Sequence, residues 1–340
     1  IFYYPLLAES RQRHTNVNTQ QTGVLLINLG TPQAPTTRGV RDYLIEFLSD
    51  KRVVELPTYL WQPLLRGVLL PIRAKRSAKL YQSIWMPEGS PLLVYSRRLA
   101  EKVQANLGDK FKLVLCMRYG KANIQAGLDV LLSAGIQSIV ILPLYPQYSA
   151  ATTASCFDVV AKVFKQSRFI PSLHWVSSYF QHPLYIHALA HQIQQYWSKH
   201  GKKAYLLFSF HGLPKRCCQL GDPYEQQCHT TARLLAAQLH LAETSYQVVF
   251  QSRFGKTVWL QPYCEVVLRQ LAEQGIKQVA VICPGFAVDC LETLEEISQR
   301  YRKLFLQAGG EDFHYISALN DTLEQTQLIA RLAKQASSDT

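Results

Sequence analysis

The sequence lacks the signatures that give α/β proteins their commonest ligands. It has no G-x-G-x-x-G dinucleotide fingerprint, no Walker phosphate loop and no G-x-S-x-G nucleophile elbow. Its eight cysteines include no C-x-x-C pair, so a zinc ribbon or a ferredoxin-like cluster lacks its usual spacing. We therefore expect free thiols in a reducing compartment.

Long hydrophobic runs are also missing. No apolar stretch approaches the ~18 residues of a membrane-spanning helix. The apolar beginning, residues 1–8, is short, and the polar residues that follow show no small-residue cleavage pattern, which is atypical of a signal peptide. We expect residues 1–22 to be a disordered tail of a cytoplasmic protein.

Acidic residues are scarce relative to basic ones. The chain has 36 Lys and Arg against 24 Asp and Glu, a formal net charge of +12. This balance favours an anionic partner, such as a polycarboxylate ligand or an anionic membrane surface. The basic residues are scattered rather than clustered, so we do not expect nucleic acid to be the partner.

Strand-length apolar runs alternate with segments of helical length. The runs are residues 24–29, 113–117, 138–144, 173–176, 205–210, 247–251 and 278–283. Continuous apolar strands separated by helices are typical of parallel sheets covered on both faces. The sequence therefore predicts a doubly wound α/β fold.

Two pairs of similar segments within the chain predict that this fold occurs twice. Residues 26–32 resemble residues 208–214, and residues 134–143 resemble residues 274–284, in the same order in each half. We expect two similar Rossmann-like domains, residues 23–170 and 171–320. A C-terminal helix over residues 321–336 should pack back on either domain.

Residues 53–73 break the pattern. They are rich in Leu and aromatic residues and are interrupted by Pro57, Pro63 and Pro71. One interpretation is an ordinary core helix. The other is an apolar lip that covers a hydrophobic ligand or touches a membrane surface.

Two polar loops in the second half follow apolar strands. His211 ends the first strand, and a helix should begin near Asp289, which would place Asp289, Glu292 and Glu296 on one face and Glu295 elsewhere. A histidine facing carboxylates can bind a divalent metal or relay protons. The alternative is structural: a lone histidine at a strand end and acids that cap a helix.

These loops belong to a larger set of motifs. The set comprises Asn28-Leu29-Gly30-Thr31-Pro32, Glu88-Gly89-Ser90-Pro91-Leu92, Pro143-Leu144-Tyr145-Pro146-Gln147-Tyr148-Ser149, Ser209-Phe210-His211-Gly212-Leu213-Pro214, Gln251-Ser252-Arg253-Phe254-Gly255 and Asp289-Cys290-Leu291-Glu292-Thr293-Leu294. With these motifs the chain resembles the ferrochelatase family, in particular its enterobacterial-type branch, from about residue 23 to residue 332. The resemblance implies a chelatase-like enzyme whose active-site cleft lies between the two domains. It implies that this enzyme inserts ferrous iron into protoporphyrin IX to form protohaem, the last step of haem biosynthesis.

The resemblance also implies roles for individual residues. His211 and Glu292 match the pair proposed to ligate iron and accept pyrrole protons, and Asp289 and Glu296 match acids that extend a proton or metal path. The positions that it places around the porphyrin are Arg118, Tyr145, Arg73, Tyr81, Ser90 and Trp259.

Departures from the family pattern refine these expectations. Leu29 stands where coproporphyrin-using relatives place a tyrosine, which favours protoporphyrin, and Cys290 stands where many members have histidine. Some members hold a [2Fe–2S] cluster on C-terminal cysteines; no cysteine follows Cys290, so we expect no permanent cofactor.

The expected partners are protoporphyrin IX and ferrous iron, with peripheral contact to the inner membrane, in a monomer or homodimer. The alternatives are a chelatase for another divalent metal or for coproporphyrin, and a non-catalytic haem or iron carrier.

Overall fold

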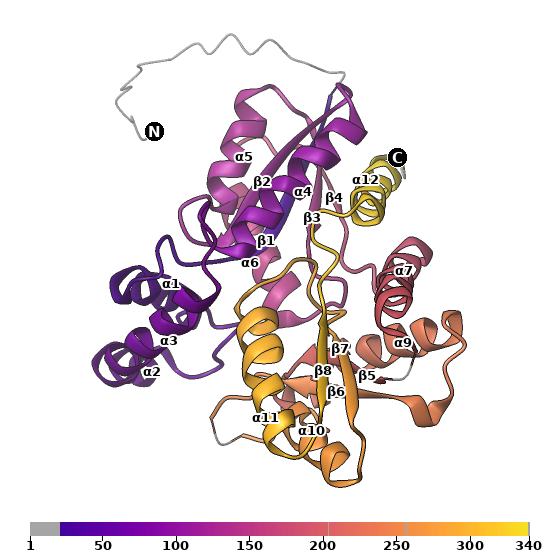
Figure 1. The fold of residues 1–340 in the computed structure, drawn as a ribbon. Coiled ribbons are helices and arrows are strands. Elements are labelled where there is room, and N and C mark those ends of the chain that lie inside the picture. Colours follow the sequence, from indigo (N-terminus) through magenta and orange to yellow (C-terminus); the bar gives the residue numbers. More distant parts are fainter. Residues whose placement is uncertain (1–20, 203, 256, 339–340) are drawn as a thin grey trace, which may run out of the picture.

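Two parallel four-stranded sheets form the centre of the protein (Figure 1). The structure is a computed structural model that describes residues 21–202, 204–255 and 257–338. The first sheet has the order β2-β1-β3-β4 and the second the order β6-β5-β7-β8. Their strands are β1 (Thr22–Gly30), β2 (Phe111–Tyr119), β3 (Ser138–Pro143), β4 (Ser172–Trp175), β5 (Tyr205–His211), β6 (Tyr246–Gln251), β7 (Gln278–Ile282) and β8 (Asp312–Ile316).

The predicted doubly wound fold is confirmed, and the strand prediction was incomplete by one strand. All seven expected strands are present, and all pairings in both sheets are parallel. The missed strand, β8, lies at a sheet edge and buries only Phe313 and Ile316. Because an edge strand needs few buried side chains, its sequence carries no continuous apolar run.

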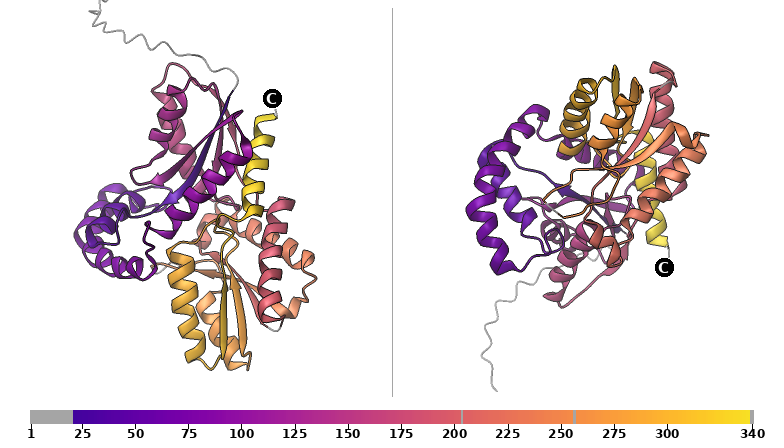
Figure 2. Two further views of the ribbon diagram at one scale, coloured as in Figure 1. Left: turned by 45° about the horizontal axis from the view of Figure 1, so that its top comes forward. Right: turned by 90° about the horizontal axis from the view of Figure 1, so that it is seen from below.

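Helices cover both faces of each sheet (Figures 1 and 2). They are α1 (Thr37–Leu48), α2 (Thr58–Leu64), α3 (Leu70–Ile84), α4 (Pro91–Leu107), α5 (Ile124–Ser133), α6 (Ser155–Lys165), α7 (Pro183–His200), α8 (Lys215–Gln219), α9 (Tyr224–Gln238), α10 (Cys264–Glu273), α11 (Arg302–Gln307) and α12 (Leu323–Ser338). Four further helical segments are not α-helices. They are the π-helices η1 (Leu65–Leu69), η2 (Ala150–Ala154) and η4 (Glu292–Tyr301), and the 3₁₀ helix η3 (Glu243–Ser245).

Strand β1 shows why the apolar runs are continuous. Val24 and Leu26 pack into one cluster with Leu99 of α4, whereas Leu25 and Ile27 pack into another with residues of α5 and α6. Successive side chains of a strand point to opposite faces, so a strand buried on both faces must be apolar at every position.

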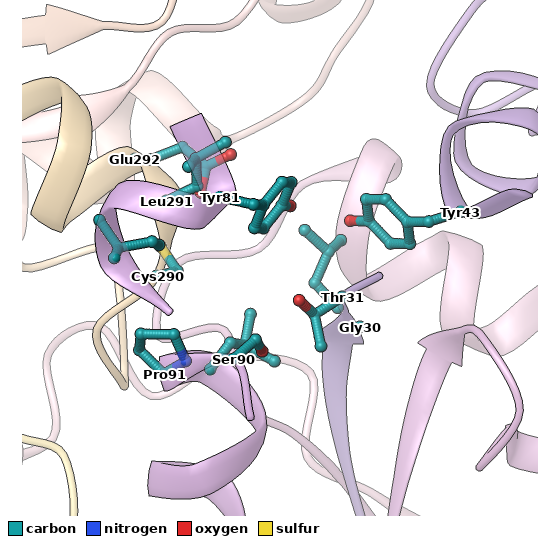
Figure 3. A pocket seen from close by; sticks show the side chains of 12 residues that line it. Gly30, Thr31, Tyr43, Tyr81, Ser90, Pro91, Cys290, Leu291 and Glu292 are labelled. Atoms are coloured by element: carbon teal, nitrogen blue, oxygen red, sulfur yellow. The ribbon is translucent and has the colours of Figure 1, made fainter. Parts of the chain in front are cut away.

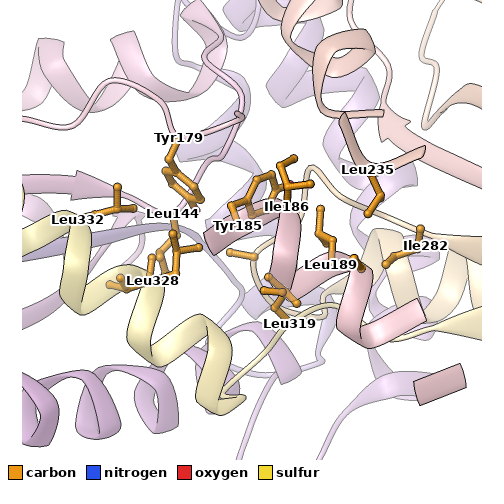
Figure 4. Packing of buried hydrophobic residues seen from close by; sticks show 14 of the residues in the cluster. Leu144, Tyr179, Tyr185, Ile186, Leu189, Leu235, Ile282, Leu319, Leu328 and Leu332 are labelled. Atoms are coloured by element: carbon orange, nitrogen blue, oxygen red, sulfur yellow. The ribbon is translucent and has the colours of Figure 1, made fainter. Parts of the chain in front are cut away.

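One hydrophobic cluster continues from the first sheet to the second (Figure 4). It contains Leu26 of β1 and Phe208 of β5, together with Tyr185 of α7 and Leu328 of α12. Helix α12 lies beside the first sheet, where it contacts α4, β3 and α7 (Figure 2). The last helix of the chain therefore packs against elements of both halves.

Residues 53–73 contribute α2, η1 and the start of α3 to a helical extension that also includes α1. Trp61, Leu65 and Leu70 are buried in it. A row spaced by four residues faces outward instead, each member 45–60% exposed: Leu56, Leu60, Leu64, Val68 and Ile72. We call this row the apolar lip. Among the residues described, no helix has the length and apolar content needed to cross a bilayer.

The expected tail falls almost wholly outside the described residues. Residues 1–20 are not described, and β1 already begins at Thr22. The C-terminal helix runs from Leu323 to Ser338, two residues later at each end than expected.

Candidate active site between the two sheets

A pocket joins the carboxyl end of β1 to a segment of the second half (Figure 3). The first half contributes the end of β1, one residue of α1, two of α3 and the start of α4. The second half contributes Cys290, Leu291 and Glu292. The lining residues are Leu29, Gly30, Thr31, Tyr43, Tyr81, Ile84, Ser90, Pro91, Leu92, Cys290, Leu291 and Glu292. The pocket thus lies where open α/β sheets bind ligands.

Two tyrosine hydroxyls face one another across this pocket (Figure 3). Burial raises the pKa of Tyr43, and Tyr81 and Glu292 raise it further. Burial likewise raises the pKa of Tyr81, helped by Glu292 and Cys290. Both phenols therefore stay protonated at neutral pH and act as hydrogen-bond donors beside a carboxylate.

His211 is the last residue of β5 and is half-buried. Its Nδ1 lies 2.6 Å from the carbonyl oxygen of Gly212. Since a carbonyl oxygen can only accept, the proton is on Nδ1 and the lone pair on Nε2. The ring lies 6.3 Å, centroid to centroid, from Phe286 in the loop that leads to Glu292. His211 therefore presents one nitrogen that can take a proton or bind a metal.

The helix that carries the acidic residues begins later than predicted. It starts at Glu292 and is a π-helix, so Asp289 precedes it and the expected shared helical face with Glu292 and Glu296 was wrong. The reason is tertiary. The Asp289 carboxylate accepts hydrogen bonds from Thr293 Oγ1 at 2.9 Å, Tyr315 OH at 2.6 Å and Asn320 Nδ2 at 2.7 Å, which hold it in the preceding loop.

Glu296 lies on the same π-helix and is equally well partnered. Its carboxylate accepts from the backbone N–H of Ser252 at 3.1 Å, from the Ser252 hydroxyl and from Tyr301 OH at 2.8 Å. The same Tyr301 oxygen lies 3.2 Å from Glu265 Oε2. Glu296 therefore connects through one phenol to a second carboxylate, whose side chain is 21% exposed.

Arg118 and Tyr145 belong to a separate polar cluster on the first sheet. The Arg118 guanidinium forms an ion pair with Asp50, donates to Ser155 and lies 4.4 Å from the Tyr119 ring centroid. Burial raises the pKa of Tyr145, and its buried hydroxyl has no hydrogen-bond partner among the described residues. The charge on Arg118 is thus already paired within the protein.

Arg73 and Trp259 meet at a loop after β6. The Arg73 guanidinium, on α3, lies 4.1 Å from the ring centroid of Phe254. Burial and the nearby Arg76 lower the pKa of Arg73, and among the described residues no carboxylate pairs with it. Trp259 donates its indole N–H to the Phe254 carbonyl at 2.7 Å. Arg73 of α3 is therefore a partly buried cation over this loop, without a carboxylate partner in the part of the chain that the structure describes.

Comparison with known proteins assigns the chain to a family. It matches the family model described as Ferrochelatase over residues 21–337. The chain belongs to the ferrochelatase family. Ferrochelatase of Yersinia enterocolitica is 50% identical over 312 residues, covering 92% of this chain and 97% of the relative. Ferrochelatase of Vibrio cholerae is 50% identical over 317 residues, covering 93% of this chain and 98% of the relative. The chain is thus a metal chelatase that inserts iron into a porphyrin in haem biosynthesis, as the motifs predicted.

Solved structures confirm the chelatase fold at low sequence identity. The sirohydrochlorin chelatase SirB from Bacillus subtilis subspecies spizizenii, solved with cobalt, has a TM-score of 0.57 and 10% identity, covering 94% of this chain and 96% of that one. CbiX, the terminal enzyme of sirohaem biosynthesis in denitrifying bacteria, has a TM-score of 0.50 and 14% identity, covering 92% and 99%.

In this ferrochelatase-family chain the residues singled out by sequence fall into three groups. Tyr81, Ser90 and Glu292 line one pocket. His211 ends β5 and Trp259 lies in the loop between β6 and α10, whereas Arg118 and Tyr145 lie at the first sheet. Within the described part of the chain, no three His, Cys, Asp or Glu side chains gather closely enough to hold a metal ion by themselves.

Sequence reasoning missed three residues of this region. Tyr43 and Thr31 line the pocket, and Gln251 is buried against the start of the π-helix. Thr31 and Gln251 stand in the family motifs at strand ends, which was a usable signal. Tyr43 lies in an ordinary amphipathic helix, where nothing in the sequence marks it.

Proposed function

We propose that this chain inserts ferrous iron into protoporphyrin IX to form protohaem, and that His211 and Glu292 meet the metal and the pyrrole protons. The observation that carries the proposal is the position of these two residues. Glu292 lines the pocket, and His211, at the end of β5, is the register partner of Gln251, whose carboxamide bonds to the Glu292 backbone. The coordinating atoms that the protein offers to iron would be one nitrogen and one carboxylate, and the porphyrin nitrogens would complete the site.

Metal insertion needs a base. A free-base porphyrin carries N–H groups on two of its four nitrogens, so the ring must bend before the lone pairs can reach the ion. Fe²⁺ enters with two positive charges and two protons leave, so the overall charge balances. In this proposal the metal passes from His211 Nε2 and the Glu292 carboxylate to the porphyrin nitrogens, and the two groups freed in this way take one pyrrole proton each.

The protons then need a way out. Glu296 is four residues beyond Glu292 on the π-helix and bonds through Tyr301 to the partly exposed Glu265. We assign Glu296 to this exit path. Asp289 holds the loop from which Glu292 emerges, because its oxygens are occupied by four donors.

The remaining residues would hold the porphyrin itself. The unpaired guanidinium of Arg73 suits a propionate, and the hydroxyls of Tyr81 and Ser90 add hydrogen-bond donors nearby. In this proposal Trp259 supports the loop under Arg73 through its bond to the Phe254 carbonyl, and Arg118 and Tyr145, which lie outside the pocket lining, would border the porphyrin from the first sheet. Leu29 lines the pocket and adds apolar surface, which favours protoporphyrin over the more acidic coproporphyrin.

The deciding experiment is anaerobic turnover. The protein is mixed with protoporphyrin IX and excess Fe²⁺, and protohaem is followed by absorbance. We expect many equivalents of product, a loss of at least 100-fold in kcat for His211→Ala and for Glu292→Gln, and normal rates for His229→Ala on the exposed face of α9.

Each contrary result identifies an alternative. Uptake that stops at one equivalent would mean a carrier. Faster insertion of Co²⁺ or Ni²⁺, or faster use of coproporphyrin, would mean a different substrate. Near-normal insertion by His211→Ala would show that the catalytic assignment is wrong.

We further propose that the protein works in the cytoplasm while held reversibly at the inner membrane by the apolar lip. Five exposed apolar side chains form the row from Leu56 to Ile72. Residues 56–87 contain no Asp or Glu and five basic residues, Arg66, Arg73, Lys75, Arg76 and Lys79. An apolar row flanked by positive charge suits an anionic lipid surface.

Vesicle flotation tests this attachment. We expect binding to vesicles with anionic phospholipid, weaker binding to neutral vesicles, and at least a fivefold loss for the triple variant Leu60→Ser, Leu64→Ser, Val68→Ser. The matched control Leu220→Ser, Leu323→Ser removes exposed apolar side chains outside the lip. Equal loss in both variants would contradict attachment through the lip.

We also propose that no [2Fe–2S] cluster is bound. A cluster requires four thiolates together. The described cysteines are free and spread over both halves, six of them buried. Protein purified without oxygen should contain less than 0.1 equivalent of acid-labile sulfide, on the order of background; stoichiometric sulfide would contradict this.

A further inference from the structure

One buried side chain links the two candidate catalytic residues. Gln251 ends β6 and is 1% exposed. Its Oε1 accepts from Ser209 Oγ at 2.7 Å and lies 3.5 Å from Cys283 Sγ. Its Nε2 donates to the backbone carbonyl of Glu292 at 2.9 Å. A single carboxamide therefore connects β5, β7 and the first residue of the π-helix.

The backbone of Gln251 reaches the other side of the site. Gln251 is the register partner of His211, and its carbonyl accepts from the N–H of Gly212 at 2.7 Å. A Cβ on Gly212 would lie 2.7 Å from that oxygen and 3.1 Å from the Trp259 ring. Only glycine permits this close approach, so the turn after His211 rests directly on Gln251.

The carboxamide has properties that its usual substitutes lack. It offers a donor and an acceptor on one rigid plane, and both are used here. An ionised glutamate accepts at both oxygens and would repel the Glu292 carbonyl. Methionine fills a similar volume and makes neither bond.

We propose that Gln251 is a positioning residue that sets the separation between the His211 imidazole and the Glu292 carboxylate. The inference rests on the proposed function of those two residues. Catalytic groups must be held within a few tenths of an ångström of their working geometry, and bonds behind them provide that accuracy. In the proposed function the porphyrin edge is bound elsewhere, by Arg73 and Tyr81 of α3 and by Ser90 at the start of α4. Loss of the carboxamide should therefore lower kcat and raise the KM for Fe²⁺, and it should leave the affinity for porphyrin unchanged.

The test compares Gln251→Met with Gln147→Met. Gln147 is also a buried glutamine, 2% exposed, but it donates to Thr231 Oγ1 at 3.0 Å rather than to the backbone of Glu292. Thermal unfolding, kcat, and KM for Fe²⁺ and for protoporphyrin IX are measured on both. We expect Gln251→Met and Gln251→Glu to lose at least tenfold in kcat and to show a several-fold higher KM for Fe²⁺, with KM for protoporphyrin within twofold of wild type.

Gln147→Met should lose a similar amount of thermal stability while its kinetic constants change less than twofold. If Gln251→Met and Gln147→Met have the same kcat and the same KM for Fe²⁺, the inference is overturned. If Gln251→Met does not fold, Ser209→Ala replaces it, since it removes one hydroxyl bonded to Oε1; unchanged kcat and KM for Fe²⁺ there would also overturn it. Activity retained by His211→Ala would defeat the proposed function itself, a result independent of the Gln251 comparison.

Discussion

At the scale of single residues, two carboxylate side chains have different roles because their partners differ. Asp289 and Glu292 are three positions apart in one motif. The Asp289 carboxylate is 2% exposed and accepts bonds from Thr293, Tyr315 and Asn320. Glu292 instead lines the pocket, together with Tyr43 and Tyr81. A carboxylate surrounded by protein donors supports structure, whereas one that faces a pocket is available to a ligand.

Asp289→Ala should therefore destabilise the fold. It leaves buried donors of Tyr315 and Asn320 unpaired, and we expect the free energy of unfolding to fall by about 3 kcal/mol. Urea denaturation measures it. Asp129→Ala on the exposed face of α5 is the control and should change stability by less than about 0.5 kcal/mol. A similarly small change for Asp289→Ala would contradict the structural role.

At the scale of elements, one carboxylate anchors the helical extension that carries the apolar lip. Asp50 follows α1 and accepts from Arg118, from Ser155 and from Tyr119 OH at 2.8 Å. Burial alone would raise the pKa of Asp50, but the hydrogen bonds from Ser155, the Arg52 backbone and Tyr119, with the charge on Arg118, lower it below its ordinary value. The helical extension is thus joined to β2 and α6 through a buried ion pair.

The pH dependence of stability should reveal this anchor. Because the folded pKa is lowered, the contribution of Asp50 is complete above the ordinary Asp pKa of about 3.9 and is lost as the pH falls through the folded value. We expect Asp50→Asn to be less stable by about 3 kcal/mol at pH 7, and the difference to shrink below pH of about 4.

The control for that prediction is Asp158→Asn. Asp158 pairs with Arg52 at 2.8 Å, and both side chains are over 40% exposed. An exposed pair contributes about 1 kcal/mol or less. Titration of Asp50 predicts that the difference in the free energy of unfolding between Asp50→Asn and wild type shrinks at low pH. A difference that stays constant from pH 7 to about pH 3 would contradict the role given to Asp50.

At the scale of the whole molecule, the two sheets share one core. The cluster in Figure 4 runs from the first sheet through α7 and α12 into the second. Leu328 of α12 is fully buried in it, and Lys102 of α4 forms an ion pair with Asp321 just before α12. The halves therefore depend on one another for burial, although each has its own sheet.

Leu328→Ala should lower the stability of both halves together. We expect a loss of about 3 kcal/mol from the cavity it leaves, in a single unfolding transition. Calorimetry checks this through the ratio of calorimetric to van't Hoff enthalpy, which should stay near one. Leu323→Ala, on the same helix but 64% exposed, is the control. Two separate transitions in Leu328→Ala would show that the halves unfold independently.

Much of the fold could be predicted from the sequence because its signals are local. The continuous apolar runs of β1 and β5 report strands buried on both faces, and the motifs at their ends placed His211 correctly at a carboxyl edge. Strand β8 escaped because Asp312–Ile316 alternates polar and apolar side chains at an edge. The helix after Asp289 was expected to begin too early, since nothing in its own sequence indicates a π-helix that starts at Glu292.

By itself the sequence determined the two doubly wound sheets, the family and the histidine at the end of β5, because these follow from the order of side chains along the chain. Only the tertiary structure decided which acid faces the pocket, that Asp50 pairs with Arg118, and that Gln251 joins His211 to Glu292. Those outcomes depend on donors and acceptors far apart in the chain, which meet only when the two halves are packed.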